Sequence, residues 1–143
     1  MNLWKIIMSD IEKTLSIIKP DAVERNLQEE IKNEFKNNGF EILQEKKIHI
    51  SKQEAETFYK VHQTKPFYND LCTYLSSGPI IVMELQKDNA ILDNRKLMGA
   101  TNPELAEEGT LRKKYGISID KNSVHGSDSL ENARIEIDFF FKD

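Results

Sequence analysis

The sequence predicts an α+β protein, a ferredoxin-like βαββαβ sandwich in which one four-stranded antiparallel sheet is covered by helices. Two observations indicate this fold. Short apolar runs of strand character alternate with longer segments in which apolar residues recur at helical spacing. Capping residues, prolines and glycines separate these segments, in the order strand, helix, strand, helices, strand, helices, short strand, helix. The 143 residues contain no internal repeat or linker-like tract, so residues 1–143 are expected to form one domain.

The first strand is expected over residues 14–19, an apolar run that Pro20 ends. Alternation places Lys19 at the carboxyl end of this strand, on the same face as two apolar residues. A cation at that position is well placed to meet a ligand. The alternative, a solvated lysine at a strand end, is the commoner role and stays open. Residues 20–23 then predict a turn or a single helical turn.

An amphipathic helix and a second strand follow. Asn26 is expected to cap the helix, with Glu29 completing a capping box. Apolar residues recur along one side of it, and Gly39 is expected to end it. The second strand is predicted over residues 40–50. Its apolar residues are expected to share one face: Phe40, Ile42, Ile48 and Ile50.

Two helices and a strand form the middle of the chain. Ser51 and Glu54 make a capping box for a helix that runs to about Val61. The next helix begins near Pro66, because proline suits a first helical turn. Residues 80–85 predict a strand buried on both faces. Three residues of the second helix are expected in the core: Leu71, Tyr74 and Leu75.

The next part of the chain alternates a helix with a loop. Asn89 is expected to start a helix that runs to Met98 and ends at Gly99. Residues 100–109 show little periodicity and predict a loop, and a loop of this length in a compact domain is often functional. Thr110 is expected to cap a short helix that follows.

The chain ends with a short strand and a helix. Residues 117–119 are expected to form the fourth strand. Asp128 and Glu131 have the spacing of a capping box, so the last helix is expected to begin near Ser129. Its buried side is expected to contain Leu130, Ala133, Ile137, Phe140 and Phe141.

Composition and charge argue against two broad classes of protein. The net charge of −4 and the pI near 5.5 disfavour a protein that coats nucleic acid, although a local group of cations would still bind a small anion. No run approaches the ~18 apolar residues of a membrane helix, so no membrane association is expected. The N-terminus lacks a signal-peptide cleavage site. Residues 1–8 are expected to be a loose extension, with Met8 as an alternative start.

Cysteine and histidine usage argues against a disulfide framework and a metal site. Cys72 is the single cysteine and lies in an apolar helical setting, which predicts a buried thiol in a reducing cytoplasm. His49 and His62 have no ligand spacing to His125 or to Cys72. The sequence also lacks the patterns G-x-x-x-x-G-K-[ST], G-x-G-x-x-G and G-x-S-x-G.

His125 is the strongest candidate for chemistry. Gly126 follows it, which lets a ligand approach the imidazole closely, and the helix start just beyond attracts anions. Imidazole is a nucleophile at neutral pH because its ordinary pKa is ~6.5. Glu136, at the edge of the buried side of the last helix, is a candidate partner for one ring nitrogen. On these residues alone, a structural histidine beside the helix remains the alternative.

Several cations and polar residues elsewhere in the chain suit a phosphate-bearing ligand. Transfer of a phosphoryl group to a nitrogen needs its negative charge neutralised and its reacting atoms held in line. The candidates for this task are Lys19, Arg95, Thr101, Arg112 and Asn122.

Beyond these physical arguments, the sequence resembles the nucleoside diphosphate kinase family from about residue 14 to residue 141. The most specific piece is residues 122–129, NSVHGSDS, which is close to the family pattern N-x-x-H-G-S-D-S. Further similar pieces lie at residues 18–23, 66–68, 77–79, 99–103 and 109–112.

The resemblance implies transfer of the γ-phosphate of a nucleoside triphosphate to a nucleoside diphosphate. His125 would be phosphorylated at Nδ1 in a ping-pong reaction with broad base specificity, with Glu136 and Ser127 orienting it and Tyr59 close by. The phosphates would be held, alongside Mg²⁺, by Lys19, Arg95, Thr101 and Arg112. Lys19 and Asn122 would contact the sugar, while Phe67 and Ile119 would enclose the base.

The resemblance also implies a homo-oligomer, with a hexamer favoured over a tetramer. Glu29, Lys65 and Tyr68 depart from residues that are common in the family, but none is assigned to the chemistry. A regulatory or nucleic-acid-binding module on the same fold is the alternative function, and the acidic net charge disfavours it. A histidine phosphocarrier is a third possibility, but it would not need a stacking residue such as Phe67.

Overall fold

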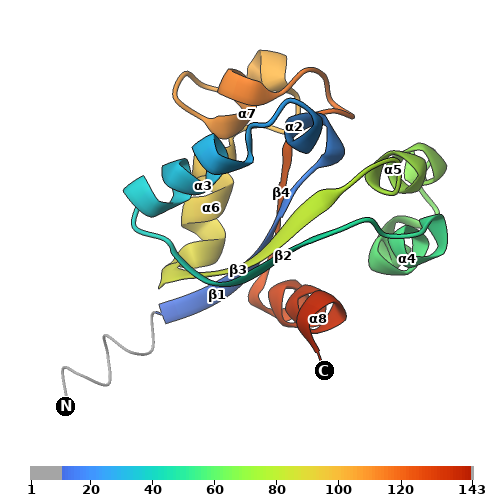
Figure 1. Ribbon diagram of the computed structural model, residues 1–143, viewed down its shortest axis with the longest axis horizontal. Coiled ribbons are helices and arrows are strands. Elements are labelled where there is room, and N and C mark those ends of the chain that lie inside the picture. Colours follow the sequence, from blue (N-terminus) through green and yellow to red (C-terminus); the bar gives the residue numbers. More distant parts are fainter. Residues whose placement is uncertain (1–10, 143) are drawn as a thin grey trace.

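A computed structural model describes residues 11–142, and the expected N-terminal extension lies outside the described residues. One sheet organises the chain (Figure 1). Its strands are β1 (Ile11–Ile18), β2 (Glu41–Ile48), β3 (Ile80–Asp88) and β4 (Val124–Gly126). They lie in the order β2-β3-β1-β4, and every neighbouring pair is antiparallel. The four-stranded antiparallel sheet is as predicted.

Helices cover both faces of this sheet (Figure 1). One face carries α2 (Pro20–Glu24), α3 (Gln28–Asn37), α6 (Ala90–Met98) and α7 (Leu111–Tyr115). The other carries α4 (Lys52–Phe58), α5 (Tyr68–Leu75) and α8 (Leu130–Phe141). Two 3₁₀ turns complete the set, η1 (Lys60–His62) and η2 (Pro103–Leu105). No helix among the described residues is long and apolar enough to cross a membrane.

The two faces of the sheet belong to separate apolar cores because neighbouring side chains of a strand point to opposite sides. On β1, Leu15 and Ile17 pack into the core under α4, α5 and α8, whereas Ile18 packs into the core under α3 and α6. Strand β3 contributes to both cores from Ile80 to Leu85, which confirms the prediction that it is buried on both faces.

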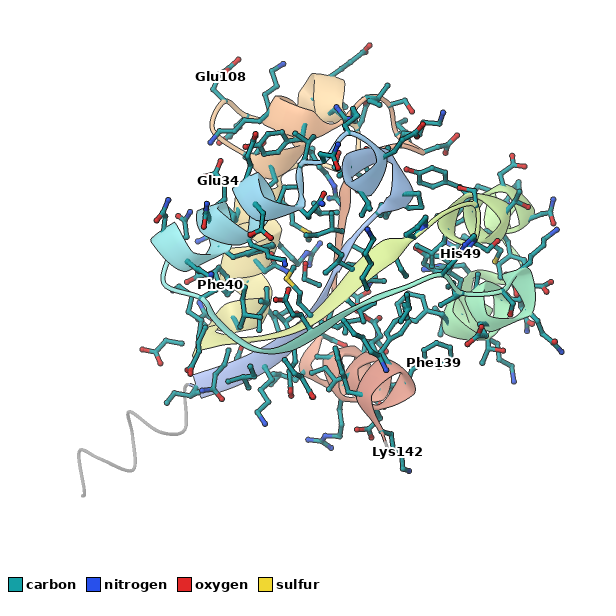
Figure 2. The ribbon with its side chains drawn as sticks, in the orientation of Figure 1. Glu34, Phe40, His49, Glu108, Phe139 and Lys142 are labelled. Atoms are coloured by element: carbon teal, nitrogen blue, oxygen red, sulfur yellow. The ribbon has the colours of Figure 1, made fainter. Side chains whose placement is uncertain are left out.

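Strand β2 departs from the predicted alternation. Its register with β3 shifts between Ile42 and Gln44, so one extra residue interrupts the ladder. Because an inserted residue reverses the side on which later residues point, Phe40 and Ile42 pack in one core while Ile48 and Ile50 pack in the other. The prediction that all four share a face was therefore wrong. The Phe40 side chain is labelled in Figure 2.

Two predicted caps were also wrong. Asn26 adopts a left-handed φ of 59° and does not cap α3, whose N-cap residue Leu27 makes no side-chain hydrogen bond. At α8 the cap is Ser129, which accepts a hydrogen bond from the Asn132 amide, so the predicted box lies one residue too early. Asp128 instead accepts a bond from the Asn132 side chain at 2.6 Å.

The fourth strand was predicted in the wrong place. Residues 117–119 form part of a turn, in which the Ile117 amide donates to the Lys121 carbonyl at 2.8 Å. The strand that pairs with β1 is β4, and it contains the histidine itself. Leu130, expected on the buried side of α8, is 54% exposed. Tyr74 is only half-buried, and its hydroxyl donates to Oδ1 of Asp21.

Other local predictions were confirmed. The capping box of Ser51 and Glu54 is complete, although α4 ends at Phe58 rather than near Val61. Thr110 caps α7 through its side chain, and α6 ends at Met98, just before Gly99. Cys72 is buried in the core with its thiol free.

Candidate active site

His125 lies in the middle of β4, directly opposite Ile17 of β1. Its Nε2 atom is 2.9 Å from Oε1 of Glu136 on α8. Ser127 donates a hydrogen bond of 2.9 Å to the same carboxylate oxygen and accepts one of 3.2 Å from the Leu15 amide. A carboxylate only accepts hydrogen bonds, so Nε2 carries the proton and Nδ1 keeps its lone pair. The sheet and α8 together therefore fix both the orientation and the tautomer of the imidazole.

Two aromatic rings from the end of α4 lie beside this imidazole. The Phe58 ring meets it edge-on, with centroids 5.3 Å apart, and the Tyr59 centroid is 6.4 Å away. All three side chains line a small cavity of about 120 Å³ that also touches Glu136. Burial raises the pKa of the Tyr59 hydroxyl, and the Glu136 charge raises it further, so this group stays a proton donor. Phe58 was missed, because the sequence around it does not distinguish it from an ordinary core aromatic.

Lys19 is only 5% exposed at the end of β1, so it is not the solvated lysine of the alternative interpretation. Its Nζ atom donates to Oδ1 of Asn122 at 2.9 Å. The Asn122 side chain in turn donates to the Thr101 carbonyl at 3.1 Å. Burial lowers the pKa of Lys19 from 10.5 to about 8, and the nearby charge of Arg112 acts in the same direction.

Arg112 is the second buried cation. Its two terminal nitrogens donate to the carbonyls of Gly99 and Val124, at 3.0 and 2.9 Å. These bonds tie the loop after α6 to the strand that carries His125, and they hold the guanidinium plane still. Burial lowers the pKa of Arg112 from 12.5 to about 10, so it remains charged at neutral pH.

A groove of about 840 Å³ runs beside β4. Arg95, Thr101 and Arg112 line it, and it reaches Gly126 next to the histidine. Three of the residues predicted to hold phosphate groups thus share one surface depression. Lys96 adds a further cation to its wall, while Glu107 and Asp128 contribute carboxylates.

Phe67 and Ile119, the two residues predicted to enclose a base, do not line this groove. Phe67 is 47% exposed at the start of α5, and its ring centroid is 6.1 Å from that of His62. The His62 centroid is in turn 6.1 Å from that of Tyr59. Ile119 is 54% exposed in the turn after α7.

The structure gives no cluster suited to a resident metal ion in the described part of the chain. Residues 11–142 contain no group of three histidine, cysteine, aspartate or glutamate side chains close enough to share a metal. His49 lies exposed near α4 and α5 (Figure 2), with its Nε2 atom 2.8 Å from the Ser76 carbonyl oxygen.

The fold and this arrangement define a class: an α+β protein with a carboxylate-held imidazole and two buried cations. One of these cations, Arg112, lines a groove suited to an anion, and the groove reaches the residue next to the histidine. A family model described as nucleoside diphosphate kinase matches residues 12–143. The nucleoside diphosphate kinase of Geotalea uraniireducens is 55% identical over 131 residues, covering 92% of this chain and 96% of the relative. That of Campylobacter jejuni strain RM1221 is 55% identical over 132 residues, with the same coverages.

Solved structures agree. The nucleoside diphosphate kinase of Aquifex aeolicus superposes with a TM-score of 0.91 at 36% identity, covering 92% of this chain and 96% of that one. The apo enzyme of Encephalitozoon cuniculi gives 0.89 at 36% identity, covering 92% and 90%. The chain belongs to the nucleoside diphosphate kinase family. The sequence-based predictions of the family, of a kinase and of the fold class are thereby confirmed.

Proposed function

We propose that this nucleoside diphosphate kinase works through a phosphohistidine on His125, in two half-reactions at one site. The observation that carries the proposal is the bond between Nε2 of His125 and Glu136, which leaves Nδ1 as the free nucleophile. In the first half-reaction the Nδ1 lone pair bonds to the γ-phosphorus of a nucleoside triphosphate. The bond from that phosphorus to the bridging oxygen breaks, and the nucleoside diphosphate leaves with its electrons.

The second half-reaction reverses the first with another nucleotide. A terminal oxygen of the acceptor diphosphate attacks the phosphorus, and the bond to Nδ1 breaks. During each transfer the imidazole gains positive character, which the Glu136 carboxylate stabilises through the proton on Nε2. Ser127 keeps that carboxylate in place because it donates to the same oxygen. Tyr59 serves as a buried donor beside the phosphorylated ring.

The remaining polar residues divide between phosphates and sugar. Arg95, Thr101 and Arg112 hold the phosphates in the groove that they line, and Lys19 adds a charge from its buried position. Arg112 suits this role because two carbonyls already fix its guanidinium. Lys19 and Asn122, which bond to each other, contact the sugar hydroxyls.

Magnesium fits this site as a companion of the nucleotide. The charged residues of the groove wall are the cations Arg95, Lys96 and Arg112 and the separate carboxylates of Glu107 and Asp128. This donor set suits an ion held through the phosphate oxygens. When bound, Mg²⁺ neutralises part of the phosphate charge. Nucleoside di- and triphosphates are the small-molecule partners.

Broad base specificity follows from the nature of the base site. Phe67 presents an exposed aromatic ring, and stacking accepts every base because every base has a π-face. Ile119 adds an apolar contact without hydrogen-bonding groups. Discrimination between bases would need donors and acceptors aimed at their edges.

The chain also acts as a homo-oligomer in the cytoplasm, with a hexamer favoured over a tetramer. Supporting this, β2 forms an exposed edge of the sheet, and α8 exposes several large apolar side chains. Light scattering coupled to gel filtration tests the assembly. A mass near six chains is expected, and a mass of one chain contradicts the proposal.

Incubation with γ-labelled ATP and Mg²⁺ tests the chemistry. Wild-type protein is expected to take up a label that acid removes and base does not, and GDP is expected to recover it as GTP. His125→Ala should take up none. The mechanism is contradicted by a wild-type protein that stays unlabelled or by a His125→Ala variant that takes up label normally.

A further inference from the structure

The backbone immediately before β4 is strained. Ser123 has a φ of 76°, a left-handed value that non-glycine residues rarely adopt. The Val124 amide donates to the Asn122 carbonyl at 2.9 Å, which closes a tight three-residue turn centred on Ser123. Asn122 lies on one side of this turn, and the strand that carries His125 begins on the other. The conformation of one residue therefore sets the spacing between the Asn122 side chain and the imidazole.

The Ser123 hydroxyl ties this turn to a buried carboxylate. It donates to Oδ2 of Asp21 at 2.8 Å, and both side chains are buried. The backbone of Ser123 is held as well, because its carbonyl accepts the Lys19 amide at 2.8 Å. The turn is thus attached at two points to the segment that runs from β1 into α2, which also carries Lys19.

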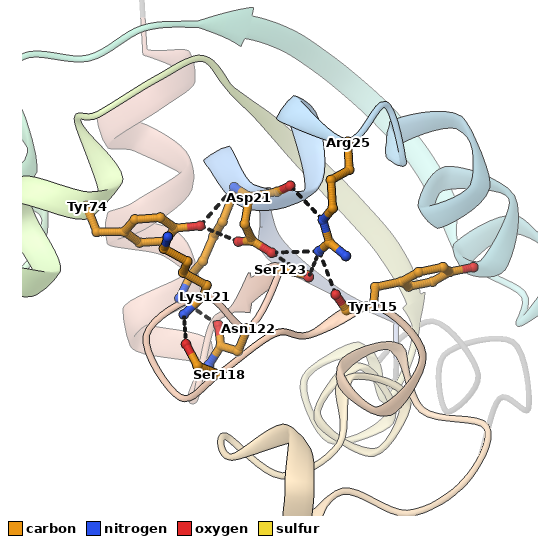
Figure 3. A network of polar contacts seen from close by, with 9 residues as sticks. Asp21, Arg25, Tyr74, Tyr115, Ser118, Lys121, Asn122 and Ser123 are labelled. Atoms are coloured by element: carbon orange, nitrogen blue, oxygen red, sulfur yellow. Dashed lines mark hydrogen bonds and ion pairs between the residues drawn. The ribbon is translucent and has the colours of Figure 1, made fainter.

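Asp21 is itself anchored by other elements (Figure 3). The Tyr74 hydroxyl on α5 donates to its Oδ1 atom, and Arg25 donates to Oδ2 at 3.0 Å. Arg25 also donates to the Tyr115 carbonyl at the end of α7, at 2.6 Å. Bonds from two other residues hold the carboxylate, so it cannot turn away from Ser123 without breaking them.

We propose that Asp21 and Ser123 are positioning residues for phosphoryl transfer: the buried carboxylate holds the Ser123 hydroxyl and so keeps the strained turn that aligns Asn122 and His125. This inference rests on the proposed function. The hydrogen bond offsets the strain of a positive φ in a residue that has a Cβ atom. Without it the turn relaxes, and the nucleotide and the imidazole lose their alignment.

Two substitutions at Ser123 distinguish the effect of losing the hydrogen bond to Asp21 from the effect of the strained backbone. Ser123→Ala removes the hydroxyl and keeps the Cβ atom. The backbone strain then remains, but the hydrogen bond to Asp21 that offsets it is lost. Ser123→Gly also removes the hydroxyl, but glycine adopts a positive φ freely. We expect Ser123→Ala to slow phosphohistidine formation ~10- to 100-fold, in line with the cost of misplaced reacting groups, and Ser123→Gly to recover most of this loss.

The test is a single-turnover measurement of phosphohistidine formation, with thermal unfolding as a check of the fold. Ser76→Ala serves as the matched control, because it removes a serine hydroxyl just after α5 that donates to the Cys72 carbonyl. Its rate should equal that of wild type, and the apparent nucleotide affinity of Ser123→Ala should change much less than its rate.

Three outcomes would overturn the inference while the wild-type protein still labels. These are an unchanged rate in Ser123→Ala, an equal loss in Ser76→Ala, and a Ser123→Gly variant as slow as Ser123→Ala. If instead the wild-type protein forms no phosphohistidine, the proposed function fails, and the inference that rests on it fails too.

Discussion

At the scale of single residues, the hydrogen bonds of the His125 imidazole favour one nitrogen as the nucleophile of the proposed reaction. Imidazole has two nitrogens of similar basicity, and either can act as a nucleophile in a free ring. In this chain Glu136 accepts the proton of Nε2, and Ser127 fixes the carboxylate that does so. In the proposed mechanism, Nδ1 is thus selected by a residue 11 positions away in the sequence.

Glu136→Gln tests that carboxylate. The amide keeps the size of the side chain but loses the negative charge that stabilises the developing imidazolium. We expect kcat to fall ~10²-fold, the scale observed when one preorganised electrostatic partner is removed. Steady-state assays with ATP and a second diphosphate measure it. A kcat that stays at the wild-type value would contradict the assigned role.

Lys19 predicts a pH dependence. Its pKa is lowered to about 8, so it is cationic below that pH and neutral above it. The charges that face it are Arg112, which favours the neutral form, and Asp21 and Asp120, which favour the cation. An anionic nucleotide loses an attraction as the pH rises through 8, so kcat/KM, which reports the free enzyme, should fall there.

A Lys19→Arg variant is the control for this pH profile. Guanidinium holds its proton to much higher pH than an amine. The fall in kcat/KM should therefore move to more alkaline pH, whatever the absolute activity of the variant. A profile that still breaks near pH 8 would assign the titration to another group.

At the scale of helices and strands, local signals were readable in the sequence and long-range ones were not. The Ser51 capping box, the Thr110 cap and the glycine stop at Gly99 involve neighbouring residues only. The bulge in β2 depends on how that strand pairs with β3. Residues 124–126 form the strand β4 because they pair with β1. Strand pairing does not change the hydrophobic pattern of the sequence. The sequence therefore predicted one shared apolar face along residues 40–50, and it placed the fourth strand at residues 117–119.

Capping energies test this distinction. Ser51→Ala should lower the free energy of unfolding by about 1 kcal/mol, because it opens a complete capping box. Asn26→Gly should cost nothing measurable, since Asn26 caps no helix and its φ of 59° suits glycine. Urea unfolding of both variants provides the comparison. An equal loss at Asn26 would mean that its side chain does stabilise α3.

At the scale of the whole molecule, the site is assembled from parts that are distant in the chain. Lys19 follows β1, Tyr59 follows α4, Arg112 lies in α7 and His125 in β4. The family-like motifs were enough to propose these residues, because each motif is short and contiguous. They did not reveal Phe58 or the Asp21–Ser123 bond, since both depend on which elements the fold brings together.

In the proposed function, a bound nucleotide extends from the groove beside β4 to Phe67 at the start of α5. Phe67→Ala should weaken the binding of ADP, GDP and CDP alike, by ~1–3 kcal/mol, because stacking is indifferent to the base. Calorimetric titrations measure this, with Leu130→Ala, another exposed apolar residue that lines neither the groove nor the cavity beside His125, as the control. A loss confined to one base would contradict stacking at Phe67.

The most direct test of the central claim is the identity of the phosphorylated nitrogen. Protein labelled with ¹⁵N-histidine can be phosphorylated by ATP and studied at once by ¹⁵N and ³¹P NMR. The hydrogen bond from Nε2 to Glu136 predicts a phosphorus–nitrogen coupling at Nδ1 of His125, with a proton retained on Nε2. A coupling at Nε2 would contradict the mechanism.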